Sequence, residues 1–394
     1  MKTALRRLLG PVASLHLTVI CLAAALVLVF AGTLAQVNSN TFQVQQQYFQ
    51  SWFIWWSAQG GGFSLPVFPG GHLIGAVLLV NLLAAHIRRF SWSRRKLGIQ
   101  LTHIGLIIML AGGLATDLFA VSSYMRLRQG ETKNYSEDDA RTELAVTELS
   151  SAEINPVTAI PGETLAAALA KDGSVSHASL PFKITVRGFY PNSDLQMIAQ
   201  EDVSAVPASS NGAGARISIK ALARFAEMNK HDTPSAVVEI LPAKGGKSLG
   251  TWLVSVAMAQ PQEFELDGRH WSLELRPARY YKSYSLSLVT FTHETYPGTE
   301  IAKNFSSKVT LADAAHNENR QVQIYMNHPL RYQGDTYYQS GFEPDNSGTV
   351  LQVVRNPSYQ APYIACMVVA LGLLIQFTYH LVGFARRAKA ATAP

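Results

Sequence analysis

Four long apolar stretches constrain this chain more than any other feature of its sequence. They cover residues 12–36, 71–87, 97–118 and 361–384. A helix needs about 20 apolar residues to cross the hydrocarbon core of a bilayer, and lengths of about 17–25 residues are usual. All four stretches fall in that range, although the second is short. The sequence therefore predicts an integral membrane protein with four transmembrane helices.

The first stretch has a signal peptide as its alternative interpretation. Its apolar core is longer than the core of a usual signal peptide, and no clean small-residue cleavage site follows it. Three further spans follow along the chain. We therefore expect the first stretch to stay in the protein as an uncleaved helix.

Basic residues flank the spans in three clusters, and such clusters accumulate on the cytoplasmic side of a membrane. The clusters are Lys2, Arg6 and Arg7; Arg88, Arg89, Arg94, Arg95 and Lys96; and Arg386, Arg387 and Lys389. Four spans place all three clusters and both termini in the cytoplasm, with residues 37–70 and 119–360 outside. The net charge of +6 largely reflects these anchors, so nucleic-acid binding has no support.

The predicted organisation is a membrane domain over residues 1–118, an extracytoplasmic domain over 119–360, a fourth helix over 361–384 and a cytoplasmic tail over 385–394. Short alternating or β-branched runs fill the large domain, and turn sequences such as "LDGRH", "YPGTE" and "YQGD" separate them. This pattern is typical of antiparallel sheets. The runs are 182–190, 215–222, 235–241, 250–258 and 285–291.

The fold class is thus four transmembrane α-helices with a large all-β, sandwich-like domain inserted between helices 3 and 4. One short helix is expected at 162–173, where Gly173 ends an alanine-rich run. Residues 192–214 are expected to form a long loop.

The external domain shows no catalytic set. It has no cysteine, because the only two, Cys21 and Cys366, lie in spans. Its histidines are scattered along the chain: His177, His231, His270, His293, His316 and His328. A binding surface is therefore a better expectation for this domain than a hydrolytic or redox site.

The short external segment contains Trp52, Trp55 and Trp56 in "YFQSWFIWWS". Tryptophans gather at the headgroup level of membranes, so an interfacial aromatic belt is one interpretation. A platform for haem or for a partner protein is the other.

Histidines inside the spans are the strongest functional signal, because ionisable residues there are rare and usually functional. Counted from the nearest basic residue at about 1.5 Å per residue, His103 lies about 10 Å deep, His16 about 13 Å and His380 about 9 Å. These three are expected to share a level in the cytoplasmic leaflet. His86 belongs to the interface, and His72 begins the second span on the external side.

Neutral imidazole is a good ligand for haem iron, so His103, His16, His380 and His86 are candidate cofactor ligands. The alternative is that each histidine snorkels or forms a hydrogen bond with a neighbouring helix.

The third span has two different faces. Gly98, Gly105 and Gly112 recur every seven residues, and small residues let another helix approach closely. His103 lies about 200° of helical turn from Gly105. One face is therefore expected to pack against a helix while the other presents the histidine.

Three segments of the chain resemble the ResB-type cytochrome c biogenesis proteins. They are "THIGLIIMLAGGLATDLFAVSSYMRLRQGET" (102–132), "YYKSYSLSLV" (280–289) and "IYMNHPLRYQGDTYYQSGFEPDNSGTVLQVVRNPS" (324–358). The order of three spans, a large external domain and a fourth span is similar as well. Residues 140–270 match only in strand character.

The resemblance implies a subunit of the system II cytochrome c synthase, which moves haem b across the membrane and attaches it to apocytochrome c outside. It implies a CcsA/ResC-type membrane protein as partner, apocytochrome c as client, and thiol–disulfide reductases as further candidate partners. His103 matches the haem-ligating histidine of the family, and its role is carried over alone. The subunit would be non-catalytic or co-catalytic, in a bacterial plasma membrane.

Two other functions remain open from the residues. A haem b subunit that passes electrons from quinol would also need intramembrane histidines, although two stacked haems would spread them across the bilayer. A haem-free scaffold that holds a partner protein would make His103 structural.

Overall fold

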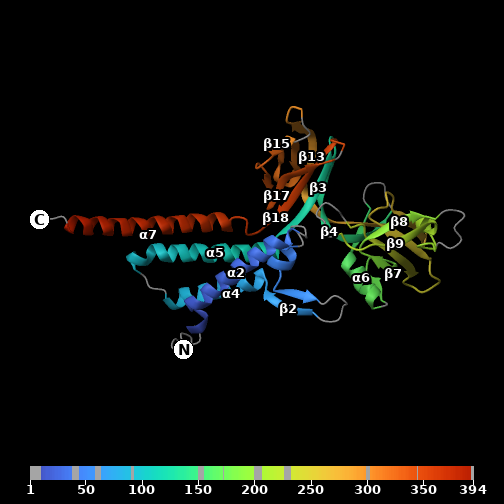
Figure 1. Cartoon of the computed structure of the whole chain (residues 1–394). Coiled ribbons are helices and arrows are strands. Elements are labelled where there is room, and N and C mark those ends of the chain that lie inside the picture. Colours follow the sequence, from blue (N-terminus) through green and yellow to red (C-terminus); the bar gives the residue numbers. More distant parts are fainter. Residues whose placement is uncertain are drawn as a thin grey trace. The chain divides into compact units, whose positions relative to one another are not determined.

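A computed structural model describes residues 10–37, 44–57, 64–89, 93–149, 155–171, 173–198, 206–225, 232–298, 302–343 and 345–391. The chain divides into two compact units (Figure 1). The helical unit comprises residues 1–121, 226–228 and 356–394, and the β unit comprises 122–225 and 229–355. Lys2, Arg6, Arg7 and His231 lie outside the described residues.

Within its described residues, the helical unit contains four long helices that are apolar enough to cross a membrane. They are α2 (Leu15–Ala35), α4 (Gly71–Arg89), α5 (Leu97–Phe119) and α7 (Ala361–Ala391). The predicted set of four membrane helices is therefore confirmed. Most of their large apolar side chains point outward, as expected for helices surrounded by lipid rather than by a protein core.

The helices associate in two close pairs, α2 with α4 and α5 with α7, and α4 also contacts α5. A buried polar residue joins the first pair. Asn81 of α4 accepts a hydrogen bond from the Thr18 hydroxyl at 2.7 Å and donates to the carbonyl of Ser14 at 3.1 Å. Hydrogen bonds between membrane helices hold them in register.

A β-hairpin precedes α4, in a segment for which the sequence predicted no strand. Its strands are β1 (Phe53–Ser57) and β2 (Ser64–Pro69), and a short π-helix, η1 (Gln45–Phe49), precedes them. Ile54 pairs with Phe68, and both side chains pack on the apolar cluster between α2 and α4. The hairpin therefore lies against the two helices.

The β unit confirms the predicted all-β domain between the third and fourth membrane helices. In the described part of this unit the one α-helix, α6 (Gly162–Ala170), lies where the sequence predicted it. The strands are β3 (Val121–Arg128), β4 (Thr132–Glu148), β5 (Val157–Pro161), β6 (Ser174–Ser176), β7 (Phe182–Tyr190), β8 (Ser193–Met197), β9 (Ile217–Ala221), β10 (Ser235–Pro242), β11 (Thr251–Ser255), β12 (Gln262–Leu266), β13 (Arg269–Thr295), β14 (Ala302–Asp313), β15 (Glu318–Tyr325), β16 (Leu330–Tyr332), β17 (Asp335–Phe342) and β18 (Gly348–Arg355).

Predicted turns lie between these strands. Asp267 and Gly268 both have positive φ at the turn from β12 to β13, and Gln333 and Gly334 do so between β16 and β17. Two consecutive residues of positive φ form the tight turn that suits the twist of an antiparallel hairpin. The turn signals "LDGRH" and "YQGD" are therefore confirmed.

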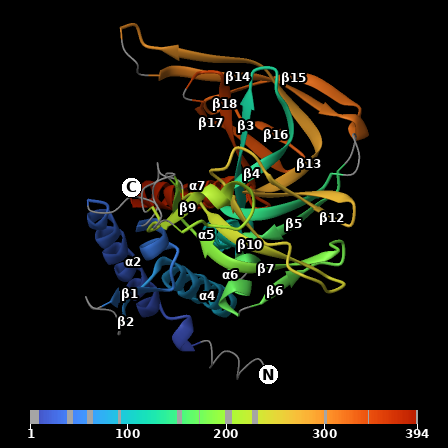
Figure 2. The ribbon, with the colours of Figure 1, turned by 90° about the vertical axis from the view of Figure 1, so that its right-hand side faces the viewer.

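The strand pairing differs from a simple sandwich, because two long strands run through two lobes (Figure 2). β13 and β4 pair along most of their length, but the register shifts after Pro277 and again after Tyr281. The first lobe combines one half of this ribbon with the four-stranded sheet β11-β10-β7-β6. The second lobe combines the other half with β3 and β14 to β18, in one highly curved sheet.

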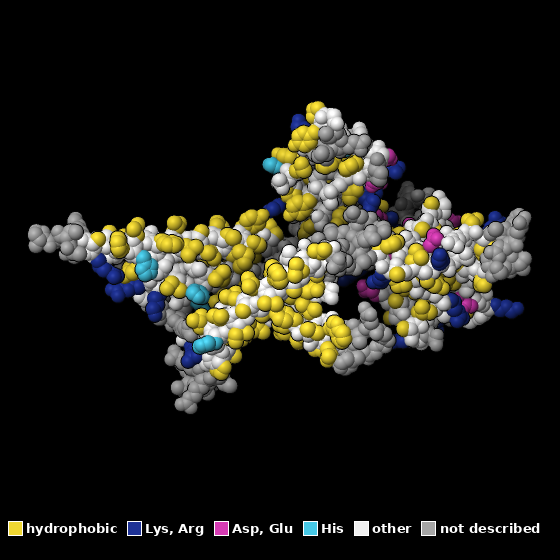
Figure 3. Space-filling model, in the orientation of Figure 1, with side chains coloured by type: hydrophobic (Ala, Val, Ile, Leu, Met, Phe, Trp, Pro, Cys, Tyr) yellow, Lys and Arg dark blue, Asp and Glu magenta, His cyan; other side chains and the backbone are white. Residues whose placement is uncertain are grey.

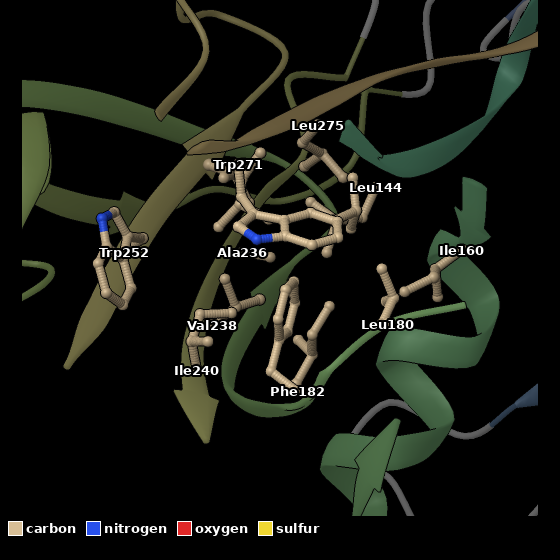
Figure 4. Close-up of a cluster of buried hydrophobic side chains, with 14 of the residues drawn as sticks. Leu144, Ile160, Leu180, Phe182, Ala236, Val238, Ile240, Trp252, Trp271 and Leu275 are labelled. Atoms are coloured by element: carbon tan, nitrogen blue, oxygen red, sulfur yellow. The ribbon is translucent and has the colours of Figure 1, made fainter. Parts of the chain in front are cut away.

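Each lobe has its own apolar core. In the first, Phe182 packs edge-on against Trp271 and Phe264, with ring centroids 5.1 and 5.2 Å apart (Figure 4). In the second, Leu286, Val309 and other alternate residues are fully buried. Two separate cores explain why so many short alternating runs occur in one domain.

The predicted loop at 192–214 is wrong for part of its length. Ser193–Met197 forms β8, which pairs with β9. The Ser193 hydroxyl donates to the hydroxyl of Ser235 at 2.7 Å, and both residues are buried. These buried polar contacts leave no apolar alternation in the sequence, so the strand signal was weak.

Candidate functional site

The glycine face of α5 packs on the last membrane helix, α7. A Cβ atom built on Gly98 would lie 2.6 Å from the carbonyl oxygen of Gly372, and one on Gly105 would lie 2.5 Å from Val369 Cγ2. Such distances are too short for any real side chain, so only glycine allows this approach. The predicted close helix contact is confirmed, and α7 is the neighbour.

His103 lies on another face of α5, half-buried. Its Nδ1 is 2.7 Å from the carbonyl oxygen of Ile99, one turn earlier. A carbonyl oxygen only accepts, so Nδ1 carries a proton, and in the neutral ring the lone pair is on Nε2. Histidines that bind metals commonly use one ring nitrogen while a backbone carbonyl holds the other.

His86 of α4 lies near His103, close enough for the two rings to interact electrostatically. The two histidines come together because α4 and α5 are in contact. At the other end of α4, His72 Nε2 lies 2.7 Å from Asp117 Oδ2 of α5. Fourteen residues separate His72 from His86 and also Asp117 from His103, which is about 21 Å of rise on both helices. His72 and Asp117 therefore form one pair at the same height along the two helices, and His86 and His103 form a second pair.

His380 does not share the level of His103, and this corrects the expectation from the sequence. Gly98 faces Gly372 and Gln376, while Gly105 faces Ala365 and Val369. In this antiparallel register, position 103 is level with about residue 369, and His380 lies about 16 Å farther along α7. The depth counted from Arg386 failed because α7 continues well past the start of α5.

The surroundings of His380 and His16 differ from those of His103. Both side chains are exposed on their helices. The Nε2 of His380 accepts a hydrogen bond from the Gln376 amide at 2.6 Å, so that nitrogen has a partner. His16 is level with Asn81, which lies five residues before His86 on α4. It is therefore about 8 Å from the level of His86 and His103, towards the His72 end of α4.

Lys, Arg and His side chains gather at one end of the helical unit, here called the basic end (Figure 3). His86 and His103 belong to this end, since Arg88 and Lys96 lie close to them in the sequence. His72 and Asp117 belong to the opposite end. Sequence reasoning missed Asp117, although it is the only acidic residue in the four helices, and such residues are rarely accidental in a span.

A family model recognises β13 to β17 and the start of β18, which form most of the second lobe of the β unit. The model for the ResB-like family matches residues 267–350, which run from the start of β13 into β18. The chain carries a ResB-like domain. The resemblance noted in the sequence is thereby confirmed.

Two curated proteins are similar to parts of this chain. Protein NrfI of Wolinella succinogenes is 30% identical over 115 residues, which are 29% of this chain and 13% of the relative. Cytochrome c biogenesis protein CcsB of a Synechococcus strain is 29% identical over 165 residues, which are 39% of this chain and 37% of the relative. The chain thus covers well under half of either relative.

The second lobe, which includes the ResB-like domain, has a buried ionic cluster that sequence reasoning did not find. Asp335 is fully buried and its carboxylate contacts Lys282 Nζ at 2.9 Å and Arg355 Nε at 2.8 Å. The Tyr284 hydroxyl donates to the same carboxylate at 3.0 Å and lies 2.7 Å from the hydroxyl of Tyr337. A bulge in β13 after Tyr281 brings Lys282 and Tyr284 to this position.

Burial alone would raise the pKa of Asp335, but the hydrogen bonds from Arg355 and Lys282 outweigh it and hold that pKa below its usual value. Burial and the neighbouring Tyr337 and Asp335 raise the pKa of Tyr284. The carboxylate therefore stays charged and the phenol neutral. The cluster ties β13, β17 and β18 together.

The external histidines do not converge on one site in the described part of the β unit. Within the described residues, no group of three His, Cys, Asp or Glu side chains is arranged to hold a metal ion. His316 pairs with Asp313, and His293 stacks on Phe305 at 4.7 Å. Of the sequence-predicted candidates, the structure thus brings only His86 and His103 together.

Proposed function

We propose that this protein acts in cytochrome c biogenesis, as the haem-receiving subunit of a system II cytochrome c synthase. The ResB-like domain and the name of the relative CcsB support the process. In this proposal haem b is the cargo, apocytochrome c is the client, and a CcsA/ResC-type membrane protein is the partner that holds the reactive haem.

The observation that carries the proposal is the state of His103. Its Nδ1–H donates to Ile99, and its Nε2 lone pair is left for iron. The surrounding apolar side chains of α5 suit the edge of a porphyrin. Haem supplies an iron that binds neutral imidazole. The hydrogen bond to the Ile99 carbonyl fixes the orientation of the His103 ring before haem binds.

His86 is the second histidine that we assign to this site. It lies level with His103 on a neighbouring helix and interacts with it electrostatically. His16 and His380 are excluded from the proposal by their different levels. In the complete synthase, the partner protein supplies the second iron ligand, and His86 borders the same haem.

The site lies at the basic end of the helical unit, which the distribution of Lys and Arg assigns to the cytoplasm. Haem therefore enters from the inner side of a bacterial plasma membrane. The β unit faces outward and has no cysteine, so it cannot form mixed disulfides with the thiols of apocytochrome c. Thiol–disulfide reductases act on the client rather than on this chain.

The decisive test is complementation. The chain is expressed with a CcsA-type partner in a host deficient in cytochrome c maturation, and covalent haem in a reporter cytochrome is measured. We expect maturation with the wild type and with His380→Ala, and a loss of at least tenfold with His103→Ala. If the chain binds haem but the reporter cytochrome is not matured, the result would favour an electron-transfer subunit instead.

Spectra of the purified chain test the ligands separately. We expect His103→Ala to abolish the reduced haem b spectrum and His86→Ala to weaken or shift it. His16→Ala and His380→Ala serve as matched controls that leave the spectrum unchanged. Purified wild type without haem would make the chain a haem-free scaffold.

A further inference from the structure

The hairpin β1–β2 belongs to the longest uncharged part of the chain. From Leu8 to Ile87, the sequence contains no Asp, Glu, Lys or Arg. A connecting loop in water normally carries charges that keep it soluble. The sequence between α2 and α4 instead combines aromatic, aliphatic and amide side chains.

The end of the hairpin farther from α4, here called the outer end, is apolar on both faces as well as uncharged. The exposed fractions are 54% for Trp55, 57% for Trp56, 45% for Leu65 and 64% for Val67. Trp55 pairs with Pro66, and Trp56 with Leu65. Four large apolar side chains on a five-residue ribbon make a patch that a soluble surface does not usually expose.

The end of the hairpin nearest α4 is anchored to the membrane helices. Ile54 and Phe68 pack on the cluster formed by Cys21 and Leu28 of α2 and Ile74 of α4. The backbone just before the hairpin is also tied to α4, since the His72 amide donates to the Ser51 carbonyl at 3.1 Å. The apolar patch is therefore continuous with the lipid-facing surface of these helices.

We propose that β1–β2 is a lipid-binding hairpin, whose outer end inserts into the interfacial region of the bilayer at the end of the helical unit opposite the basic end. An isolated two-stranded hairpin is marginal in water, and insertion would remove its exposed apolar surface from water. Tryptophan suits this position, because its ring is amphipathic and prefers the headgroup level.

The edges of the hairpin set the depth of insertion. A two-stranded ribbon has two unpaired edges, which do not occur within the hydrocarbon core. Pro66 and Pro69 lack an amide hydrogen, so β2 has fewer donors that need water. The hairpin accordingly lies at the boundary of headgroups and acyl chains rather than deeper.

Quenching by brominated lipids tests this contact. The chain has six tryptophans, and Trp52→Phe with Trp92→Phe removes the two that belong neither to the hairpin nor to the β unit. This variant is placed in nanodiscs with phospholipid brominated high on the acyl chain. We expect strong quenching of its emission, and a loss of most of that quenching when Trp55→Phe and Trp56→Phe are added. The buried Trp252 and Trp271 provide the unquenched remainder.

Two results would overturn the proposal. Quenching by aqueous iodide without quenching by brominated lipid would mean that the patch faces water and is kept for a protein partner. Equal lipid quenching with and without Trp55 and Trp56 would place the contact elsewhere.

A label provides a second readout if the tryptophan variant does not fold. Bimane is attached at Val67→Cys in a background of Cys21→Ala and Cys366→Ala, with Lys244→Cys in an exposed turn of the β unit as control. Brominated lipid should quench the label at position 67 and leave that at position 244 unchanged; equal responses would contradict insertion.

Discussion

The ionic cluster of the second lobe yields the sharpest prediction, which concerns Asp335→Asn. The Asp335 side chain is completely buried, and that of Lys282 is only 6% exposed. Removing the carboxylate charge leaves the ammonium of Lys282 buried without a counter-charge. Loss of one partner of a buried ion pair costs about 3–5 kcal/mol. Arg355 adds less to this cost, because its side chain is 59% exposed and water can solvate it.

Hydrogen exchange of the whole chain in detergent, read by mass spectrometry, measures this cost locally. At about 1.4 kcal/mol per factor of ten, peptides from β17 and β18 should exchange roughly 100- to 4000-fold faster in the variant. Peptides from β7 and β10, in the core of the first lobe, should change little. The matched control is Glu239→Gln, which breaks a more exposed pair with Arg187 and should cost about 1 kcal/mol or less.

The double variant Asp335→Asn with Lys282→Met decides between explanations. If the buried unpaired ammonium is the cause, replacing it with an apolar side chain should restore much of the protection. Protection in β17 that is equal in Asp335→Asn and wild type would refute the reasoning. So would a double variant that is less stable than the single one.

Three further predictions follow from the geometry. Gly105→Val should separate α5 from α7, because its Cβ would lie 2.5 Å from Val369 Cγ2, and the free energy of unfolding in detergent should fall by about 1–3 kcal/mol. Gly113→Val, with open space around its Cβ, is the control. Equal losses of stability in the two variants would contradict the packing of α5 on α7. Because the pKa of Asp335 is lowered in the folded protein, its contribution to the stability of the second lobe is complete above the ordinary aspartate pKa of about 3.9 and is lost as the pH falls below that value. Hydrogen exchange in β17, corrected for the intrinsic rate, should show this loss of stability at low pH in the wild type and not in Asp335→Asn. Asp117→Asn should weaken the contact with His72 and cost about 1–2 kcal/mol. The control is Glu163→Gln, whose partner Arg141 is largely exposed and which should leave the melting temperature unchanged. An unchanged melting temperature for Asp117→Asn would show that the pair is not stabilising.

The helices and turns were predictable because each depends on local composition. Apolar length alone identified the four spans, and Gly98, Gly105 and Gly112 identified a face for close packing. The sequence could not say that α7 would occupy that face. Helix pairing depends on the fit of two surfaces, and the glycines specify only one of them.

The ionic cluster was not predictable, because buried charges look like exposed ones in a sequence. Lys282 and Asp335 stand 53 positions apart, in strands that read as alternating runs. A bulge in β13 turns Lys282 inward, and bulges leave only a weak signal in the sequence. The length of β13 was missed for the same reason, since its kinks looked like breaks between separate strands.

The membrane histidines show why contacts between helices outweigh depths counted along one helix. Counting from basic residues assumes that each anchor lies at the same membrane surface, and this gave His103, His16 and His380 one level. The pair His72–Asp117 at one end of α4 and α5 fixes the relative register of these helices directly. Equal spacing along both then brings His86 beside His103, whereas the glycine contacts with α7 carry His380 about 16 Å away. A site that needs two side chains on one cofactor must satisfy the register of the helices, and His86 and His103 are the pair of sequence-predicted candidates that does.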